Sequence, residues 1–252
     1  MIYSIQNASL WKRMSALLLD FIILLILTTG FAFVLSSITN YSYYDEELHK
    51  YYNQYEEEYG CKIDISNSEY EELSEEEQQK YQDMFAALNA DEQVLYFYNT
   101  TINLMMLIVS IGVLLAVLIA EFVVPLFLKN GQTLGKKIFA IGVVKNNSVR
   151  ITHLQLFVRS ILGKYAIELM VPIFLAILIL IGHGNLIIIL LLFGILIFQT
   201  MLCIFTKNRQ PIHDILAYTV VVDMQTQMVF DSEEQLLEYK KNNHLKEVNN
   251  SK

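Results

Sequence analysis

The chain alternates between long apolar runs and polar segments in which its charged residues collect. A soluble protein mixes the two classes, because each helix or strand keeps a polar face toward water. Here four apolar runs approach or exceed the roughly 20 residues that a helix needs to cross a membrane. We therefore predict an all-α membrane protein with four transmembrane helices. The predicted boundaries are 1–38 for the N-terminus and first span, then 101–128, 165–181 and 186–205 for the other spans.

The polar segments between the spans differ in length and charge. Residues 39–100 are acidic and rich in tyrosine, whereas residues 129–164 are basic and contain no acid. Only residues 182–185 separate the last two spans, which predicts an antiparallel helical hairpin. Residues 206–252 form a polar C-terminal segment.

The basic residues predict the orientation of the chain. Lys12 and Arg13 precede the first span, Lys207 and Arg209 follow the fourth, and the segment after the second span is also basic. Basic residues are enriched on the cytoplasmic side of membrane proteins. We therefore expect a multi-pass plasma-membrane protein with both termini in the cytoplasm and the acidic segment 39–100 outside it.

Local signals predict helices within the acidic segment. Residues 43–59 are dense in Glu and Tyr and end before Gly60, which is a typical C-cap. Ser74 and Glu77 have capping-box spacing, and Asp91 is placed to cap a helix that continues into the second span. The expected structure is a helical extracytoplasmic insertion.

The segments expected in the cytoplasm combine helix and strand signals. Thr152 and Gln155 have capping-box spacing, which places the start of the third helix near His153. Residues 140–152 alternate β-branched side chains around polar residues and predict a short hairpin, with 219–222 as a candidate third strand. We expect a small cytoplasmic β element.

Composition restricts the possible functions. The net charge of −8 arises in residues 39–100, so the charge balance gives no support for nucleic-acid binding. Cys61 and Cys203 lie in different segments, and we expect no disulfide between them. The His213-Asp214 pair lacks further metal ligands, and no Ser-His-Asp or Cys-His set is present at a usable spacing. We expect no enzymatic activity, no catalytic residues, no metal and no cofactor.

Three separated motifs carry a resemblance. Arg13 stands at the start of the first span and Asp20 within it, 131–138 reads Gly-Gln-Thr-Leu-Gly-Lys-Lys-Ile and is followed by Arg159, and Asp214 lies after the fourth span. In this order they resemble the RDD family of membrane proteins, named for one arginine and two aspartates. The resemblance covers the spans and the segments expected in the cytoplasm, but not the acidic segment. It implies a loose association with transport, and most members have no assigned activity.

Asp20 needs a compensating group inside the membrane. A charge at the bilayer centre costs roughly 2.5–3.5 kcal/mol on insertion scales. Arg13 shares its helix face, but helical side chains lean toward the N-terminus, so Arg13 points away from Asp20. Arg159 or Arg209 is the expected partner. Asp20 then serves either a cation or proton site, or a buried ion pair that fixes helix packing.

Two glutamates within spans have similar surroundings. Glu121 precedes Pro125 by four residues, and Glu168 precedes Pro172 by four. Proline removes the hydrogen bond to the carbonyl of residue i−4, here the carbonyl of the glutamate itself. A freed carbonyl beside a carboxylate suits Na⁺ or a proton, so Asp20, Glu121 and Glu168 are the candidate cation or proton site. The alternative is two kinked helices with interfacial glutamates.

Two further features have structural explanations. Asp214 follows Pro211 in what is expected to be the first turn of a helix, where an acid is favoured, with Arg159 or Arg209 as a possible charge partner. Lys136 and Lys137 are expected on a basic amphipathic helix that contacts anionic lipid headgroups.

Two hypotheses of function remain at this stage. The first is a transport-related protein that handles a monovalent cation or proton through its intramembrane carboxylates; because four spans are few for a carrier, it predicts a homo-oligomer in the lipid bilayer. The second is a non-catalytic scaffold or sensor whose acidic outer loop binds a partner or ion.

Overall fold

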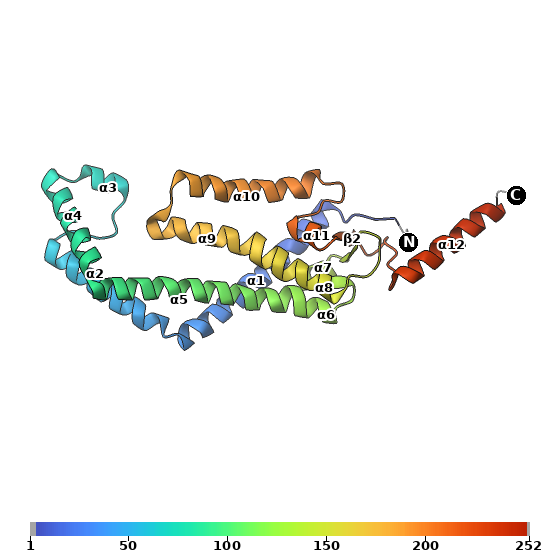
Figure 1. Ribbon diagram of the computed structural model, residues 1–252, viewed down its shortest axis with the longest axis horizontal. Coiled ribbons are helices and arrows are strands. Elements are labelled where there is room, and N and C mark those ends of the chain that lie inside the picture. Colours follow the sequence, from blue (N-terminus) through green and yellow to red (C-terminus); the bar gives the residue numbers. More distant parts are fainter. Residues whose placement is uncertain (1–3, 251–252) are drawn as a thin grey trace. The chain divides into compact units, whose positions relative to one another are not determined.

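The computed structural model describes residues 4–250 (Figure 1). Within this part of the chain, 4 helical stretches are long and apolar enough to cross a membrane, which confirms the predicted number of spans. The first is α1 (Leu10–Ile38); the second joins α5 (Glu92–Val117), the π-helical η1 (Leu118–Val123) and α6 (Val124–Phe127); the third joins α8 (His153–Phe157), the π-helical η3 (Val158–Met170), α9 (Val171–Leu178) and η4 (Ile179–His183); the fourth is α10 (Leu186–Phe205).

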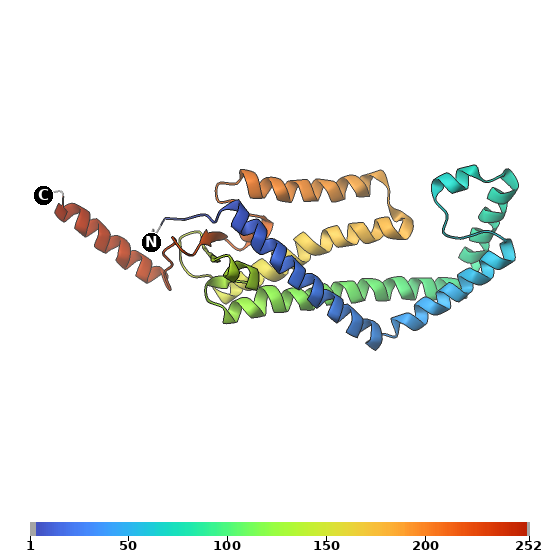
Figure 2. The same ribbon diagram turned by 180° about the vertical axis from the view of Figure 1, so that it is seen from behind.

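The third helix begins where its capping signal predicts. The hydroxyl of Thr152 accepts a hydrogen bond from the backbone N–H of Gln155, and the Gln155 side chain bonds back to the N–H of Thr152. The helix ends at a turn in which Gly182 has a φ of 82°, a left-handed conformation that glycine adopts without a steric penalty. After this turn α10 runs back beside α9 (Figures 1 and 2), as the predicted helical hairpin requires.

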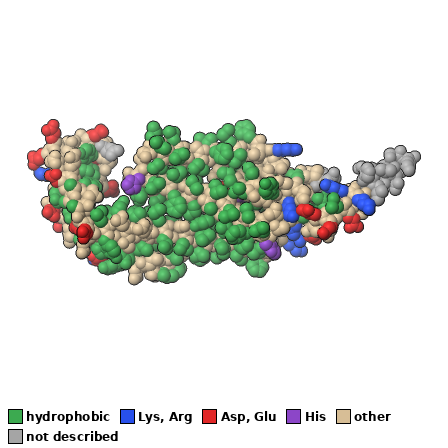
Figure 3. Space-filling view, viewed as in Figure 1, with side chains coloured by type: hydrophobic (Ala, Val, Ile, Leu, Met, Phe, Trp, Pro, Cys, Tyr) green, Lys and Arg blue, Asp and Glu red, His purple; other side chains and the backbone are tan. Residues whose placement is uncertain are grey.

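The chain forms two compact units. One consists of Thr29–Gly112 and is called the acidic unit here; the other consists of Met1–Thr28 and Val113–Lys252 and is called the sheet unit. Acidic side chains gather over the acidic unit, whereas hydrophobic side chains cover the spans (Figure 3). This segregation is what the sequence pattern predicts for a chain that crosses a membrane.

The acidic unit has its own hydrophobic core. Leu48, Met84, Leu88 and Val94 are buried at its centre, and tyrosine rings pack around them. The predicted caps are confirmed: Gly60 adopts a φ of 68° after one helix, and the next long helix starts with a capping box at Ser74. Asp91 accepts hydrogen bonds from the backbone at the start of α5. The helices that precede α5 are α2 (Tyr41–Tyr59), α3 (Asn67–Glu72) and α4 (Glu75–Ala90).

A two-stranded antiparallel sheet organises the sheet unit. β1 (Ile141–Lys145) pairs with β2 (Thr219–Asp223), with Val143 opposite Val221. The strand predicted at 219–222 is therefore confirmed. The predicted hairpin within 140–152 is only partly formed, since its return arm makes an isolated bridge between Val144 and Arg150. β2 takes the place of that arm because its valines complete the buried core beside β1.

Short elements connect the sheet to the spans. η2 (Lys129–Gly131) and α7 (Leu134–Ile138) link the second span to β1, and α11 (Ile212–Leu216) links the fourth span to β2. α12 (Glu233–Asn250) follows the sheet. The protein is thus an all-α membrane protein with a small sheet, the predicted fold class.

Candidate functional site

Nine charged or titratable side chains of the sheet unit interact with one another or with nearby backbone, and we call them the charge network. Five of them are almost completely buried, although burial of an unpaired charge is costly. They come from α1, η1, α7, η3 and α11, so elements far apart in the sequence must fold before the network exists. Its members are Arg13, Asp20, Glu121, Lys136, Arg159, Lys164, Glu168, His213 and Asp214.

Asp20 is held by the segment that precedes β1. The hydroxyl of Thr133 donates to one carboxylate oxygen, and the backbone N–H of Gly135 donates to the other at 2.8 Å. A Cβ atom on residue 135 would lie 2.4 Å from the carbonyl oxygen of Ala16, so only glycine allows this approach of α7 to α1. The predicted pairing of Asp20 with Arg159 or Arg209 is wrong, because neutral donors occupy both of its oxygens.

Arg13 does not contact Asp20, as the direction of helical side chains predicted. Its guanidinium donates to the backbone carbonyl oxygens of Arg209 and Val221, the latter at 2.6 Å. Arg209 adopts a φ of 53°, which places this carbonyl within reach of the arginine. Arg13 thereby fastens α1 to β2, and Arg209 contributes its backbone to this contact.

Glu121 is buried between two lysines. Lys164 donates to Oε1 of Glu121, and the Nζ atom of Lys136 lies 3.6 Å from Oε2. Burial lowers the pKa of Lys136 to about 8, although Glu121 acts in the opposite direction. Lys136 points inward and is therefore not placed to bind lipid headgroups, which corrects its expected role. Lys137 is exposed and keeps that expectation.

The two span glutamates lie in π-helical segments. Glu121 belongs to η1 and Glu168 to η3, and Pro125 and Pro172 follow at the start of the next α-helix. In a π-helix each N–H bonds to the carbonyl five residues back instead of four, so the hydrogen-bond register changes ahead of each proline, which has no N–H to donate. π-helical turns occur frequently at functional sites. The sequence indicated an irregularity at both places but not its type.

Asp214 forms the most buried ion pair of the network. Its Oδ1 atom accepts a hydrogen bond of 2.7 Å from Nε of Arg159 and one of 2.8 Å from the Thr219 hydroxyl. Burial raises the pKa of this carboxyl, but the charges of Arg159 and His213 and the hydrogen bonds from Arg159 and Thr219 together outweigh burial, and the pKa falls to about 2. Arg159 was one of the two charge partners predicted for Asp214.

Glu168 binds His213 twice. Its Oε2 atom lies 2.6 Å from Nδ1 of the imidazole, and its Oε1 atom accepts from the backbone N–H of His213 at 2.9 Å. On the other side of the ring, Nη2 of Arg159 lies 3.0 Å from Nε2. The sequence did not indicate a role for His213, because its partners Arg159 and Glu168 lie in the third span and no local pattern points to them.

The three acids predicted to form one cation site have separate partners. Asp20 is bound by Thr133 and Gly135, Glu121 by lysines, and Glu168 by His213. Within residues 4–250, no group of three or more His, Cys, Asp and Glu side chains is arranged to hold a metal ion. The network therefore lacks a carboxylate cage of the kind that was expected.

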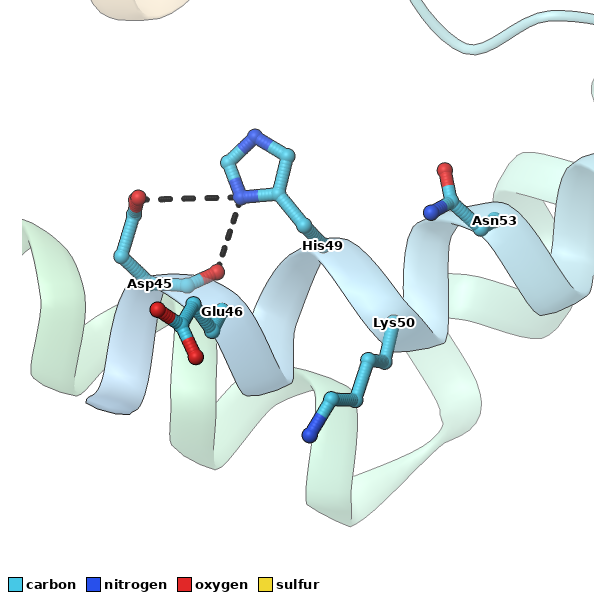
Figure 4. A pocket seen from close by; sticks show the side chains of 5 residues that line it. All are labelled: Asp45, Glu46, His49, Lys50 and Asn53. Atoms are coloured by element: carbon cyan, nitrogen blue, oxygen red, sulfur yellow. Dashed lines mark hydrogen bonds and ion pairs between the residues drawn. The ribbon is translucent and has the colours of Figure 1, made fainter. Parts of the chain in front are cut away.

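A shallow pocket on the acidic unit is a weaker candidate. Figure 4 shows its lining on a single helix, α2, where the His49 ring lies toward Asp45 and Lys50 points away. The Nδ1 atom of His49 is 2.8 Å from the backbone carbonyl oxygen of Asp45. No second element closes the pocket, so it lacks the convergent polar groups that a specific small-molecule site needs.

The order of these motifs along the chain can be compared with known families. The sequence model of the RDD family matches residues 7–218. The chain belongs to the RDD family. The matched range includes Arg13, Asp20 and Asp214, and all three belong to the charge network of this RDD protein. No curated protein and no solved structure matches the chain.

Proposed function

We propose that this RDD protein is transport-related and that its buried carboxylates handle a proton, or a monovalent cation in exchange for one. The observation that supports this is the charge network itself. Ionisable groups within membrane spans are costly and mark ion or proton pathways in many membrane proteins. The network contains four carboxylates and four basic side chains of Lys and Arg, so its net charge is zero when His213 is neutral.

The contacts favour a proton over a metal cation. Both oxygens of Asp20, both of Glu121 and both of Glu168 already face protein donors. A cation such as Na⁺ binds through several oxygen ligands and would have to displace these donors. A proton needs a single acceptor atom, and transfer of one leaves most of the network intact.

The test is a flux measurement in everted vesicles. An imposed pH gradient is followed with a pH-sensitive dye while Na⁺, Li⁺ or K⁺ is added to vesicles that carry the full chain. Asp20→Asn removes the charge of Asp20, while the asparagine amide still accepts from Gly135 and donates to Thr133. Asp83→Asn is the matched control, because Asp83 is an exposed acid on α4.

The two outcomes separate clearly. Transport predicts that added cation collapses the gradient in the wild type and in Asp83→Asn, and that Asp20→Asn reduces the initial rate at least about tenfold, equivalent to roughly 1.4 kcal/mol. A gradient that persists in wild-type vesicles with correctly inserted protein rejects exchange of these cations.

The same proposal includes an orientation and an assembly. The excess of basic residues supports a plasma-membrane protein with both termini in the cytoplasm and residues 39–100 outside. Labelling of Cys61 by an impermeant thiol reagent in intact cells, compared with Cys61→Ser, tests this topology. Because four spans are few for a carrier, we also propose a homo-oligomer, and crosslinking in native membranes that yields only monomers would reject it.

A scaffold or sensor role is the second candidate. The compact core and capped helices of the acidic unit support it, because an insertion with its own fold is suited to recognise an external partner or ion. This role predicts that deletion of residues 42–97 abolishes function while Asp20→Asn does not. The transport proposal predicts the opposite pattern.

A further inference from the structure

The contacts of His213 define the position of its proton. Arginine is only a donor, so the Nη2 atom of Arg159, 3.0 Å away, requires Nε2 of His213 to be an acceptor. The single proton of the neutral ring then resides on Nδ1, from which it is donated to Glu168 at 2.6 Å. This assignment rests on the hydrogen-bond partners and defines a neutral imidazole whose unprotonated Nε2 accepts from Arg159.

An unpaired oxygen lies next to that nitrogen. Oδ2 of Asp214 is buried and, among the described residues, has no hydrogen-bond partner. It lies 3.8 Å from Nε2 of His213. A buried carboxylate oxygen without a donor is costly, because it has lost its contact with water and gained nothing in return. The ion pair with Arg159, at 2.7 Å, favours the anionic form of Asp214 and lowers its pKa, so this oxygen carries negative charge.

The surroundings of His213 limit how it can move. A Cβ atom on Gly163 would lie 2.6 Å from Cα of His213, so the backbone of α11 is packed directly against η3. The side chain of His213 retains 12% of its exposure, so the ring is not completely enclosed by protein. The charged groups that face it are Arg159 and Glu168 from η3 and Asp214 from α11. Beyond them, Lys164 acts electrostatically on Glu168, and Arg13 from α1 and Cys203 from α10 interact with Asp214.

We propose that His213 is a proton-binding site, in which an incoming proton bonds to Nε2 and the imidazolium then pairs with Oδ2 of Asp214. The lone pair of Nε2 forms the new N–H bond, the hydrogen bond from Arg159 breaks, and the charge of the network rises by one. Arg159 stays bound to Oδ1 of Asp214 through Nε. Glu168 remains bound to Nδ1 and stabilises the charged ring.

The site deepens the proposed function, because His213 would be the group that carries the transported or coupled proton. The carboxylates would then stabilise charge and need not themselves be protonated. The protonation itself can be measured without any transport assay, so a failure of this inference and a failure of the transport proposal are distinguishable.

The first measurement is the ¹⁵N NMR spectrum of the full chain, labelled at histidine, in lipid nanodiscs across pH. His213→Gln assigns the signal by its absence, and the exposed His153 serves as an internal reference. The expected result is an Nδ1–H tautomer for His213 at high pH that converts to imidazolium as the pH falls. An Nε2–H tautomer at high pH, or a ring that stays neutral while His153 is fully protonated, overturns the proposal.

Two variants test the assigned partners. Removal of a neighbouring anion disfavours a cation, so Glu168→Gln and Asp214→Asn are each expected to require about tenfold more H⁺ for half-protonation of His213. Asp83→Asn, far along the chain in the acidic unit, is expected to leave the titration unchanged. A titration that is identical in all three variants overturns the proposal, and the wild-type spectrum remains decisive if a variant fails to fold.

A transport assay tests whether the proton bound by His213 is the one that is transported or coupled. In everted vesicles, His213→Gln is expected to lose the pH dependence of any proton flux, because glutamine donates to Glu168 but accepts no proton. If the wild type moves no protons while His213 still titrates as described, the transport proposal fails and the proton site stands.

Discussion

Asp20 accepts a hydrogen bond of 2.8 Å from the backbone N–H of Gly135, at a position where the main chain of α7 leaves no room for a side chain against α1. The acid and the glycine are therefore one structural unit. The hydrogen bonds to Asp20 depend on the close packing of α7 against α1. A displacement of α7 would remove both donors, the Thr133 hydroxyl and the Gly135 N–H, from Asp20 together.

Gly135→Ala is expected to destabilise the protein by about 1–3 kcal/mol, since an added methyl group in a packed interface forces the backbone apart. Thermal unfolding in detergent, followed by size-exclusion fluorescence, measures the loss. Gly194→Ala in α10 is the control, because nothing lies within 4 Å of a Cβ at that position. Equal stability of the two variants would contradict the packing that the structure shows.

Asp214→Asn is expected to lower the free energy of unfolding by about 3–5 kcal/mol, because it leaves Arg159 buried without its anion. The double variant Arg159→Met with Asp214→Leu is expected to recover part of that loss, since it removes both charges. Equilibrium unfolding by denaturant in micelles compares the three proteins. A single variant as stable as the wild type would show that the pair contributes nothing.

The pH dependence of the same pair has a definite sign. The pKa of Asp214 is lowered from 3.8 to about 2 in the folded state, so the unfolded chain binds this proton more readily. The stabilisation is fully present above pH 3.8 and decreases by about 2 kcal/mol as the pH falls toward 2. Acid titration of the unfolding midpoint measures it, and Asp214→Asn is expected to show a smaller decrease.

Lys136 is expected to produce a trend of the same sign, a stability that rises with pH, at alkaline pH. Its pKa falls from 10.5 to about 8 on folding, so between these values the unfolded chain holds the extra proton. Stability therefore rises with pH through this window, by at most about 3 kcal/mol. Unfolding midpoints at pH 8 and pH 10 measure the rise, and Lys136→Met removes it. A rise of equal size in Lys136→Met would assign it to another group.

Lys137 is expected to contact anionic headgroups, whereas its neighbour Lys136 is not. Lys137→Gln is expected to reduce the extra stability that anionic vesicles confer over neutral ones by about 1 kcal/mol. Lys136→Gln lowers stability in both lipids alike. Unfolding temperatures in the two vesicle types give the comparison, and an unchanged lipid effect in Lys137→Gln would contradict the assignment.

The spans and capped helices were predictable because their signals are local. The run of apolar residues in α10 and the capping boxes at Ser74 and Thr152 determine their conformation within a few positions. The strand at 219–222 was found in the same way. Its partner was assigned less well, because a short valine strand can pair with any available edge and the choice is made by the packed core.

The partners within the charge network were harder to predict because they are not local. A backbone N–H has no signature in a sequence, so Gly135 could not be recognised as the partner of Asp20. The adjacent lysines 136 and 137 look equivalent in sequence, and only the position of Glu121 makes one of them buried. In the sequence His213 was considered only beside Asp214. Its bond to Glu168 joins α11, which follows the fourth span, to the third span.

The pairing of β1 with β2 also sets an order of events during synthesis. β1 precedes the last two spans in the chain and β2 follows them, so β1 leaves the ribosome long before its partner exists. The backbone N–H of Ala8 and the guanidinium of Arg13 also donate to the carbonyl oxygen of Val221, which is synthesised later as part of β2. Ala8 and Arg13 are therefore secured only after β2 has been synthesised, and a ribosome that stalls before β2 releases a chain that lacks these contacts and the β1–β2 pair.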